Sequence, residues 1–196
     1  MVITSRQLEI IEEASKILTS SGVSGLTIKN LAKAMQFSES AIYRHFTSKE
    51  EIIIAMLQYL SESIEKRLSS IIISSDPEEN FKALFREQIK FFKINPHFVV
   101  AVFSDGLMEE SQRINEIIIK QMNFKMRYLM PVIMDGQQKG VFTNIITTEE
   151  LMHIIMGAFK LQMFKWRVAN FEYDIDWSGN NMIHSILTLI KKNRND

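Results

Sequence analysis

The sequence predicts an all-α protein, from its periodicity, its composition and its helix-capping signals. Apolar residues recur at intervals of three and four along most of the 196 residues, which is the pattern of helices with a buried face. Seven glycines and three prolines are few enough to leave room for long helices. At 48–51 and at 147–150 a Ser or Thr is followed three residues later by Glu, and this capping-box spacing marks two helix starts.

The composition is that of a soluble globular protein without disulfides. The chain has 23 basic and 23 acidic residues and no cysteine, so it offers no thiolate metal site and no disulfide framework. Its longest apolar runs, Ile52–Leu57 and Phe98–Phe103, are far too short to span a membrane. The N-terminus carries acids where a signal peptide needs an apolar run. We therefore expect a cytoplasmic protein that makes no contact with a membrane.

The first 50 residues read as three helices. The first runs from Thr4 to about residue 21, and Thr27 caps the second. After a turn at Met35–Phe37, Ser38 caps a third helix that we predict over Ser38–Phe46.

In this third helix two apolar residues point one way and the remaining side chains point outward. Ile42 and Phe46 lie four residues apart, on the buried side. Tyr43, Arg44 and His45 are left on or near the outer surface. A helix of two turns cannot bury so much polar and aromatic surface by itself. The pattern indicates a helix-turn-helix whose second helix meets DNA.

These residues also resemble a known family. The segment from Leu26 to Ile53 is similar to the DNA-binding region of the TetR family of bacterial transcriptional regulators, most specifically in Ala41–Phe46 followed by Ser48–Glu51. The resemblance covers about the first 60 residues. It implies a helix-turn-helix domain (1–50) joined by a continuous helix to a helical domain (51–196) that binds an effector and forms a dimer. It also implies a repressor that binds a palindromic operator and is released by a small molecule.

The resemblance carries DNA contacts to nine positions. Arg44 can form a bidentate pair with guanine, and Tyr43 and His45 can reach phosphates. The matching positions are Thr27, Lys29, Ser38, Ser40, Ala41, Tyr43, Arg44, His45 and Lys49.

Two residues depart from the family pattern. Gln36 stands where a glycine is usual, and it is expected to pay a cost for positive φ. Glu39 opens the recognition helix with a negative charge that suits the helix dipole but repels phosphate. The alternative function is therefore a helical ligand-binding protein that no longer binds specific DNA.

The remainder of the chain predicts six further helices. The segments run from Lys49 to about 70, from Pro77 to about 94, 98–103, 111–139, from Thr148 to about 170, and 178–192. The last two carry more apolar face than one chain needs, so we expect a homodimer through them.

The many Met and Phe residues raise the prospect of an apolar effector pocket, although such residues more often just fill a core. A pocket with polar groups among apolar ones would suit a lipophilic effector. The expected lining comprises Phe85, Gln88, Phe92, Phe103, Met122, Met126, Phe159, Gln162, Met163 and Trp166.

An enzyme is the weakest interpretation. Glu150 and His153 have the spacing of one di-iron ligand pair, but neither His97 nor His184 has an acid three residues earlier to complete a second. The chain contains no phosphate-binding glycine loop and no nucleophile-elbow motif. We therefore expect no catalytic residues, no metal and no cofactor.

Overall fold

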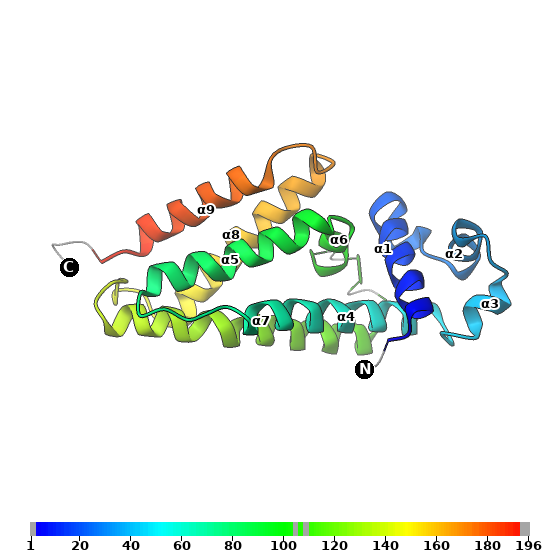
Figure 1. Ribbon diagram of the computed structural model, residues 1–196, viewed down its shortest axis with the longest axis horizontal. Coiled ribbons are helices and arrows are strands. Elements are labelled where there is room, and N and C mark those ends of the chain that lie inside the picture. The colour runs from blue at the N-terminus through cyan, green and yellow to red at the C-terminus, as the bar shows by residue number, and fades with distance from the viewer. Residues whose placement is uncertain (1–2, 104–105, 108–109, 193–196) are drawn as a thin grey trace. The chain divides into compact units, whose positions relative to one another are not determined.

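The computed structural model describes residues 3–103, 106–107 and 110–192, without the side chains of residues 102, 103, 124 and 125. Within these ranges the chain is built from helices and contains no β-strand beyond an isolated bridge between Phe142 and Lys191. The all-α prediction is confirmed (Figure 1). The helices are α1 (Ser5–Gly25), α2 (Ile28–Met35), α3 (Glu39–Tyr43), α4 (Lys49–Ser69), α5 (Pro77–Ile94), α6 (His97–Phe103), α7 (Gln112–Gln138), α8 (Thr148–Val168) and α9 (Ile175–Ile190).

The helices form two compact units. The first contains Met1–Ser63 and Asn95–Gln121, and the second contains Ile64–Ile94 and Met122–Asp196. Because α4 and α7 contribute to both units, the units do not divide at a single point of the chain.

The first unit is organised around α1, which packs on α2 and α6. Its buried face carries Ile10, Ile11 and Leu18, none of which is exposed to solvent. The hydroxyl of Thr19 donates to the backbone carbonyl of His97 at 3.2 Å and ties α6 to α1. Figure 1 shows α1, α2 and α3 grouped together, so the core of this unit supports the short helix α3.

The second unit is held together by α5, α8 and α9. The ring of Phe85 lies edge-on to that of Phe159 on α8, with centroids 5.3 Å apart. Gly179 allows α9 to pack closely on α5, since a β-carbon at this position would lie 2.4 Å from Ile89 Cδ1. Aromatic packing and one close helix contact therefore build this core.

Several predicted boundaries were wrong, each for a local reason. The last helix begins at Ile175 rather than at Ser178, because the carboxylate of Asp174 accepts from the backbone N–H groups of Asp176 and Trp177 and caps it. Helix α3 ends at Tyr43 rather than at Phe46. The N–H groups of residues 45 and 46 both donate to the carbonyl of Ile42, so the chain continues as a turn.

None of the described helices is both long enough and apolar enough to span a membrane.

Candidate nucleic-acid interface and effector cavity

The turn between α2 and α3 depends on a left-handed residue. Gln36 has φ 57° and ψ 37°, as predicted for the position that is usually glycine in the family. This conformation lets the N–H of Phe37 donate to the carbonyl of Ala32 at 2.8 Å, which ends α2. Glutamine therefore keeps the geometry of the turn, at the cost of an unfavourable backbone conformation.

Helix α3 exposes polar and aromatic side chains above a buried apolar pair. The hydroxyl of Ser38 accepts from the N–H of Ala41 at 3.2 Å and caps the helix. Ile42 is fully buried and Phe46 is buried, so they anchor the segment to the core. Tyr43 remains 51% exposed, and Arg44 is also exposed. The long side chain of Arg44 can reach a base edge or a phosphate.

The other predicted DNA contacts lie on the same three consecutive elements. Thr27, Lys29, Ser38 and Ser40 are exposed. The Oγ atoms of the two serines are 2.9 Å apart. Three more predicted contacts are half-buried: Ala41, His45 and Lys49. The nine residues thus lie on or directly beside α2, α3 and the start of α4.

A polar network at the start of α4 has no counterpart in the sequence pattern. Glu50 accepts a hydrogen bond from the Ser111 hydroxyl at 2.6 Å, and the guanidinium of Arg113 lies 3.2 Å from Glu50 and 3.0 Å from Glu51. The hydrogen bond that Arg113 donates to Glu51, followed by the negative charges of Glu50 and Glu51, raises the pKa of Arg113. Lys49 pairs with Glu110 at 2.7 Å. The first turn of α4 is therefore tied to residues 110–113.

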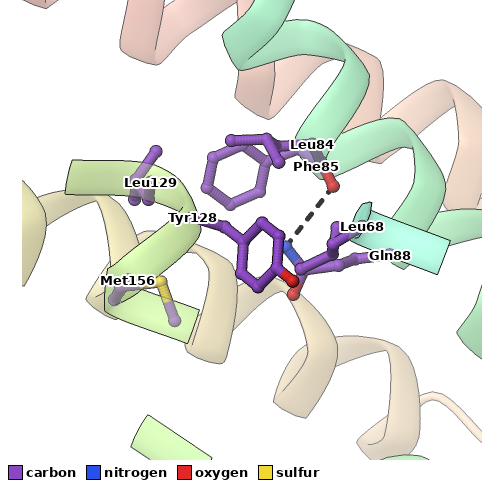
Figure 2. Close-up of a pocket in the computed structure, with 7 residues that line it drawn as sticks. All are labelled: Leu68, Leu84, Phe85, Gln88, Tyr128, Leu129 and Met156. Carbon is purple, nitrogen blue, oxygen red and sulfur yellow. Dashed lines mark hydrogen bonds between the residues drawn. The ribbon is translucent and has the colours of Figure 1, made fainter. Parts of the chain in front are cut away.

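The second unit contains a small cavity of about 10 Å³, enclosed by side chains of four helices (Figure 2). Its lining consists of Leu68 from α4, Leu84, Phe85 and Gln88 from α5, Tyr128 and Leu129 from α7, and Met156 from α8. Of the predicted pocket residues, only Phe85 and Gln88 are among them. The other five could not be predicted, because apolar periodicity marks a buried face without showing which residues enclose a space.

The remaining predicted pocket residues lie elsewhere. Phe92, Phe159 and Met163 are buried in the core. Met122 is 60% exposed and Met126 is half-buried. The predicted contribution of Phe103 lies outside the described side chains.

Gln162 and Trp166 have a structural role that the sequence analysis did not recognise. The Gln162 amide donates to the Tyr173 hydroxyl at 3.1 Å and to the Ser178 hydroxyl at 3.0 Å. The Trp166 indole N–H donates to the Tyr173 carbonyl at 3.0 Å. Burial raises the pKa of Tyr173, so its hydroxyl stays protonated. These bonds join α8 to the segment before α9 and to the first turn of α9.

Glu150 acts as a helix cap. One of its carboxylate oxygens accepts from the N–H of Thr147 at 3.2 Å and from its hydroxyl at 2.8 Å. These bonds lower the pKa of Glu150. Among the residues that the structure describes, no three His, Asp or Glu side chains are grouped to hold a metal ion. The hydrogen bonds of the Glu150 carboxylate are those of a capping box at the start of α8.

Helix α8 also carries an exposed apolar stripe. Ile154, Leu161, Phe164 and Val168 are 48–65% exposed, and their spacing keeps them on one face of the helix. A β-carbon added at Gly157, within this stripe, would meet nothing within 4 Å. On α9, Trp177 and Leu189 are exposed by 69% and 78%. So large an apolar surface is unusual for a monomer in water.

Comparison with known proteins agrees with this architecture. A family model described as "Bacterial regulatory proteins, tetR family" matches residues 10–56. The nucleoid occlusion factor SlmA of Vibrio campbellii is 26% identical over 86% of this chain and 91% of its own length. The probable acrEF/envCD operon repressor of Escherichia coli is 26% identical over 95% of this chain and 87% of its own length.

A solved structure shows the same fold. The transcriptional regulator FadR from Bacillus subtilis, determined in complex with stearoyl-CoA, superposes with a TM-score of 0.74 at 15% identity. The match covers 92% of this chain and 97% of that one. The helix-turn-helix at residues 10–56 is therefore that of the tetR family of bacterial regulatory proteins, and the two relatives and FadR are similar to this chain over most of its length. None of these three proteins is named as an enzyme.

Proposed function

We propose that the protein is a cytoplasmic repressor that binds a palindromic operator as a homodimer. The observation that carries the proposal is the exposure of Tyr43 and Arg44 above the buried anchors Ile42 and Phe46. A short helix fixed in this way can enter the major groove with its outer face. The proposed DNA-binding domain is 1–50, and 51–196 carries effector binding and dimerisation.

The proposed contacts divide into base reading and phosphate binding. Arg44 forks onto a guanine, and Ala41 is small enough to let the helix approach a thymine methyl. The hydroxyls of Thr27, Ser38 and Ser40 are the proposed donors to phosphate, although the first two also accept as helix caps. One of the two serine hydroxyls donates to the other, so that serine has to exchange this bond for one to phosphate. The phosphate contacts are completed by Lys29, Tyr43, His45 and Lys49.

The exposed stripe on α8 supports the proposed dimer. In a dimer, α8 and α9 of each subunit would pack together as a four-helix bundle. This bundle would bury the apolar stripe of each α8 against its copy. A two-fold axis through that bundle would present two recognition helices to the two halves of a palindrome.

The cavity of the second unit supports an effector that is small and lipophilic. Five of its seven lining residues are apolar, and the FadR structure, which has this fold, was determined with stearoyl-CoA, a ligand that carries a long apolar chain. Helix α4 begins at Lys49, among the proposed DNA contacts, and its last turn supplies Leu68 to the cavity. Any ligand that moves this turn therefore acts on the helix that also carries Lys49.

Selection of bound DNA from a random pool tests the proposal. A repressor of this type enriches a palindrome, protects it in a footprint and loses affinity steeply with salt. Enrichment of no sequence would instead favour the alternative of a ligand-binding protein without specific DNA binding. The observation for that alternative is the negative charge of exposed Glu39 at the start of α3.

A further inference from the structure

The cavity of the second unit contains a buried hydrogen-bond acceptor. Gln88 is 6% exposed, and its side-chain oxygen Oε1 has no hydrogen-bond partner among the described residues. Its amide nitrogen Nε2 donates to the Leu84 carbonyl in a long bond of 3.4 Å. Figure 2 shows this bond, with the amide turned to the side of the cavity on which Tyr128 lies.

An acceptor of this kind is costly in an apolar setting. Leaving a buried carbonyl without a donor costs more than the net gain from an ordinary hydrogen bond. The cavity, at about 10 Å³, has room for roughly one water molecule. A ligand that enters has to supply a donor of its own, or the oxygen loses any partner that water can give it.

The rest of the lining decides which donor is suitable. Leu68, Leu84, Phe85, Leu129 and Met156 are apolar, and no lining residue is charged. A carboxylate or phosphate in this position would face the Gln88 oxygen, another acceptor, without a cation among the lining residues. An ammonium group would have no counter-ion there. The lining therefore favours a neutral N–H or O–H group.

The cavity can widen for a ligand larger than water. Met156 is unbranched and adapts its shape readily, and it lies on the wall contributed by α8. The only other polar side chain among the lining residues is that of Tyr128, on the wall contributed by α7.

We propose that the effector presents a neutral hydrogen-bond donor, a hydroxyl or an N–H on an apolar or aromatic body, to Oε1 of Gln88. This inference rests on the proposed role of the cavity as the effector site. It adds the class of head group, and it makes Gln88 the residue that selects the head group.

Two flat compounds of nearly the same shape test the proposal on the full-length protein without DNA. Indole carries an N–H donor, and benzofuran has an oxygen in its place. Binding is followed by NMR of the Met156 methyl group, which Met156→Leu assigns. Gln88→Met keeps the length of the side chain and removes its carbonyl. The preference for indole over benzofuran should fall about tenfold in this variant.

The controls separate the head group from cavity shape. Met156→Ile should change the affinity for both compounds by the same factor, with the Gln88 side-chain amide as the NMR probe. Indole-3-carboxylate, which adds a negative charge, should bind the wild type at least tenfold more weakly than indole. An unchanged preference in Gln88→Met, or no response of the Met156 methyl to either compound, overturns the inference.

Operator binding is measured separately. If indole binds through Gln88 but never changes operator affinity, the head-group inference stands and the proposed effector release fails. If operator binding responds to other compounds while indole and benzofuran bind equally well, the proposed effector release stands and the head-group inference fails.

Discussion

The Nζ atom of Lys49 lies 2.7 Å from a carboxylate oxygen of Glu110. Both side chains are largely shielded, with exposed fractions of 29% and 26%. Lys49 is a proposed phosphate contact, so the carboxylate competes with DNA for the same ammonium group. Arg113 pairs with Glu50 and Glu51 beside it, which keeps residues 110–113 close to the start of α4.

Replacement of Glu110 by Gln should strengthen DNA binding. The substitution removes a negative charge near the phosphates and releases Lys49 to contact them. A partly exposed ion pair is worth about 0.5 kcal/mol, so we expect operator affinity to rise about two- to threefold. Fluorescence anisotropy with the selected operator, at several salt concentrations, measures the change.

Glu116→Gln is the matched control, because it removes the same charge from an exposed position on α7. An equal gain in both variants would mean that net charge alone is responsible. Unchanged or weaker binding by Glu110→Gln would contradict the proposed competition.

Arg44→Ala should weaken the preference for the operator while the fold is kept. The side chain is exposed beside the anchors of α3, so its removal leaves no cavity. Loss of a bidentate guanine contact costs about 1–3 kcal/mol and relaxes specificity at that base pair. Competition between operator and mutated operators measures the loss, and circular dichroism checks the fold. Lys29→Ala is the comparison, expected to weaken all sequences alike if Lys29 contacts phosphate.

Gln36→Gly should raise the melting temperature. At φ 57° a side chain is unfavourable by about 1–2 kcal/mol, whereas glycine costs about 0.5–1 kcal/mol in the unfolded chain. The difference of roughly 0.5–1 kcal/mol corresponds to about 1–4 °C for a chain of this size. Gln36→Ala keeps a β-carbon and should bring no gain. A lower melting temperature for the glycine variant would show that the glutamine side chain stabilises the turn.

Local signals were readable from the sequence. The predicted helix caps are present in the structure at Thr27, Ser38 and Thr147, the last with Glu150 as a capping box. They could be predicted because each cap joins residues only three positions apart. The left-handed conformation of Gln36 was implied by the family resemblance, in which its position is usually glycine. Periodicity also identified the outward side of α3, since a buried residue every four positions fixes the orientation of a helix.

Long-range packing was not readable in the same way. The pairs of Lys49 with Glu110 and of Glu50 with Arg113 join residues about 60 positions apart. Gln162 is predicted to line a pocket because it is polar within an apolar helix. In the structure its amide instead donates to the hydroxyl of Tyr173, in the segment between α8 and α9. Tertiary packing determines which partner a polar side chain meets. The apolar periodicity of a single helix does not reveal that partner.

Leu161→Glu should break the proposed dimer. Leu161 is 58% exposed in the middle of the α8 stripe, where an opposing copy would bury the new charge. The expected result is a shift from twice the chain mass of 22.8 kDa to that mass, measured by light scattering after size exclusion. Ile72→Glu makes the same kind of change at a residue that is 92% exposed outside α8 and α9, and it should remain dimeric. A monomeric wild type, or a dimeric Leu161→Glu at micromolar concentration, would reject this interface.

His97 should make the first unit sensitive to acid. Burial, with the positive charge of Lys16 as a second cause, lowers the pKa of His97 below its usual value near 6.5. Its ring nitrogen Nε2 is buried without a hydrogen-bond partner among the described residues.

Because the folded pKa lies below the unfolded one, the stabilising contribution is complete above about pH 6.5 and is lost as the pH falls through the folded pKa. His97→Gln has no proton to take up, so its melting temperature should fall less than that of the wild type between pH 7.5 and 5.5. His45→Gln, at the other half-buried histidine of this unit, is the comparison variant and controls for the loss of a histidine as such. Parallel pH curves for wild type and His97→Gln would exclude His97 as the source of acid sensitivity.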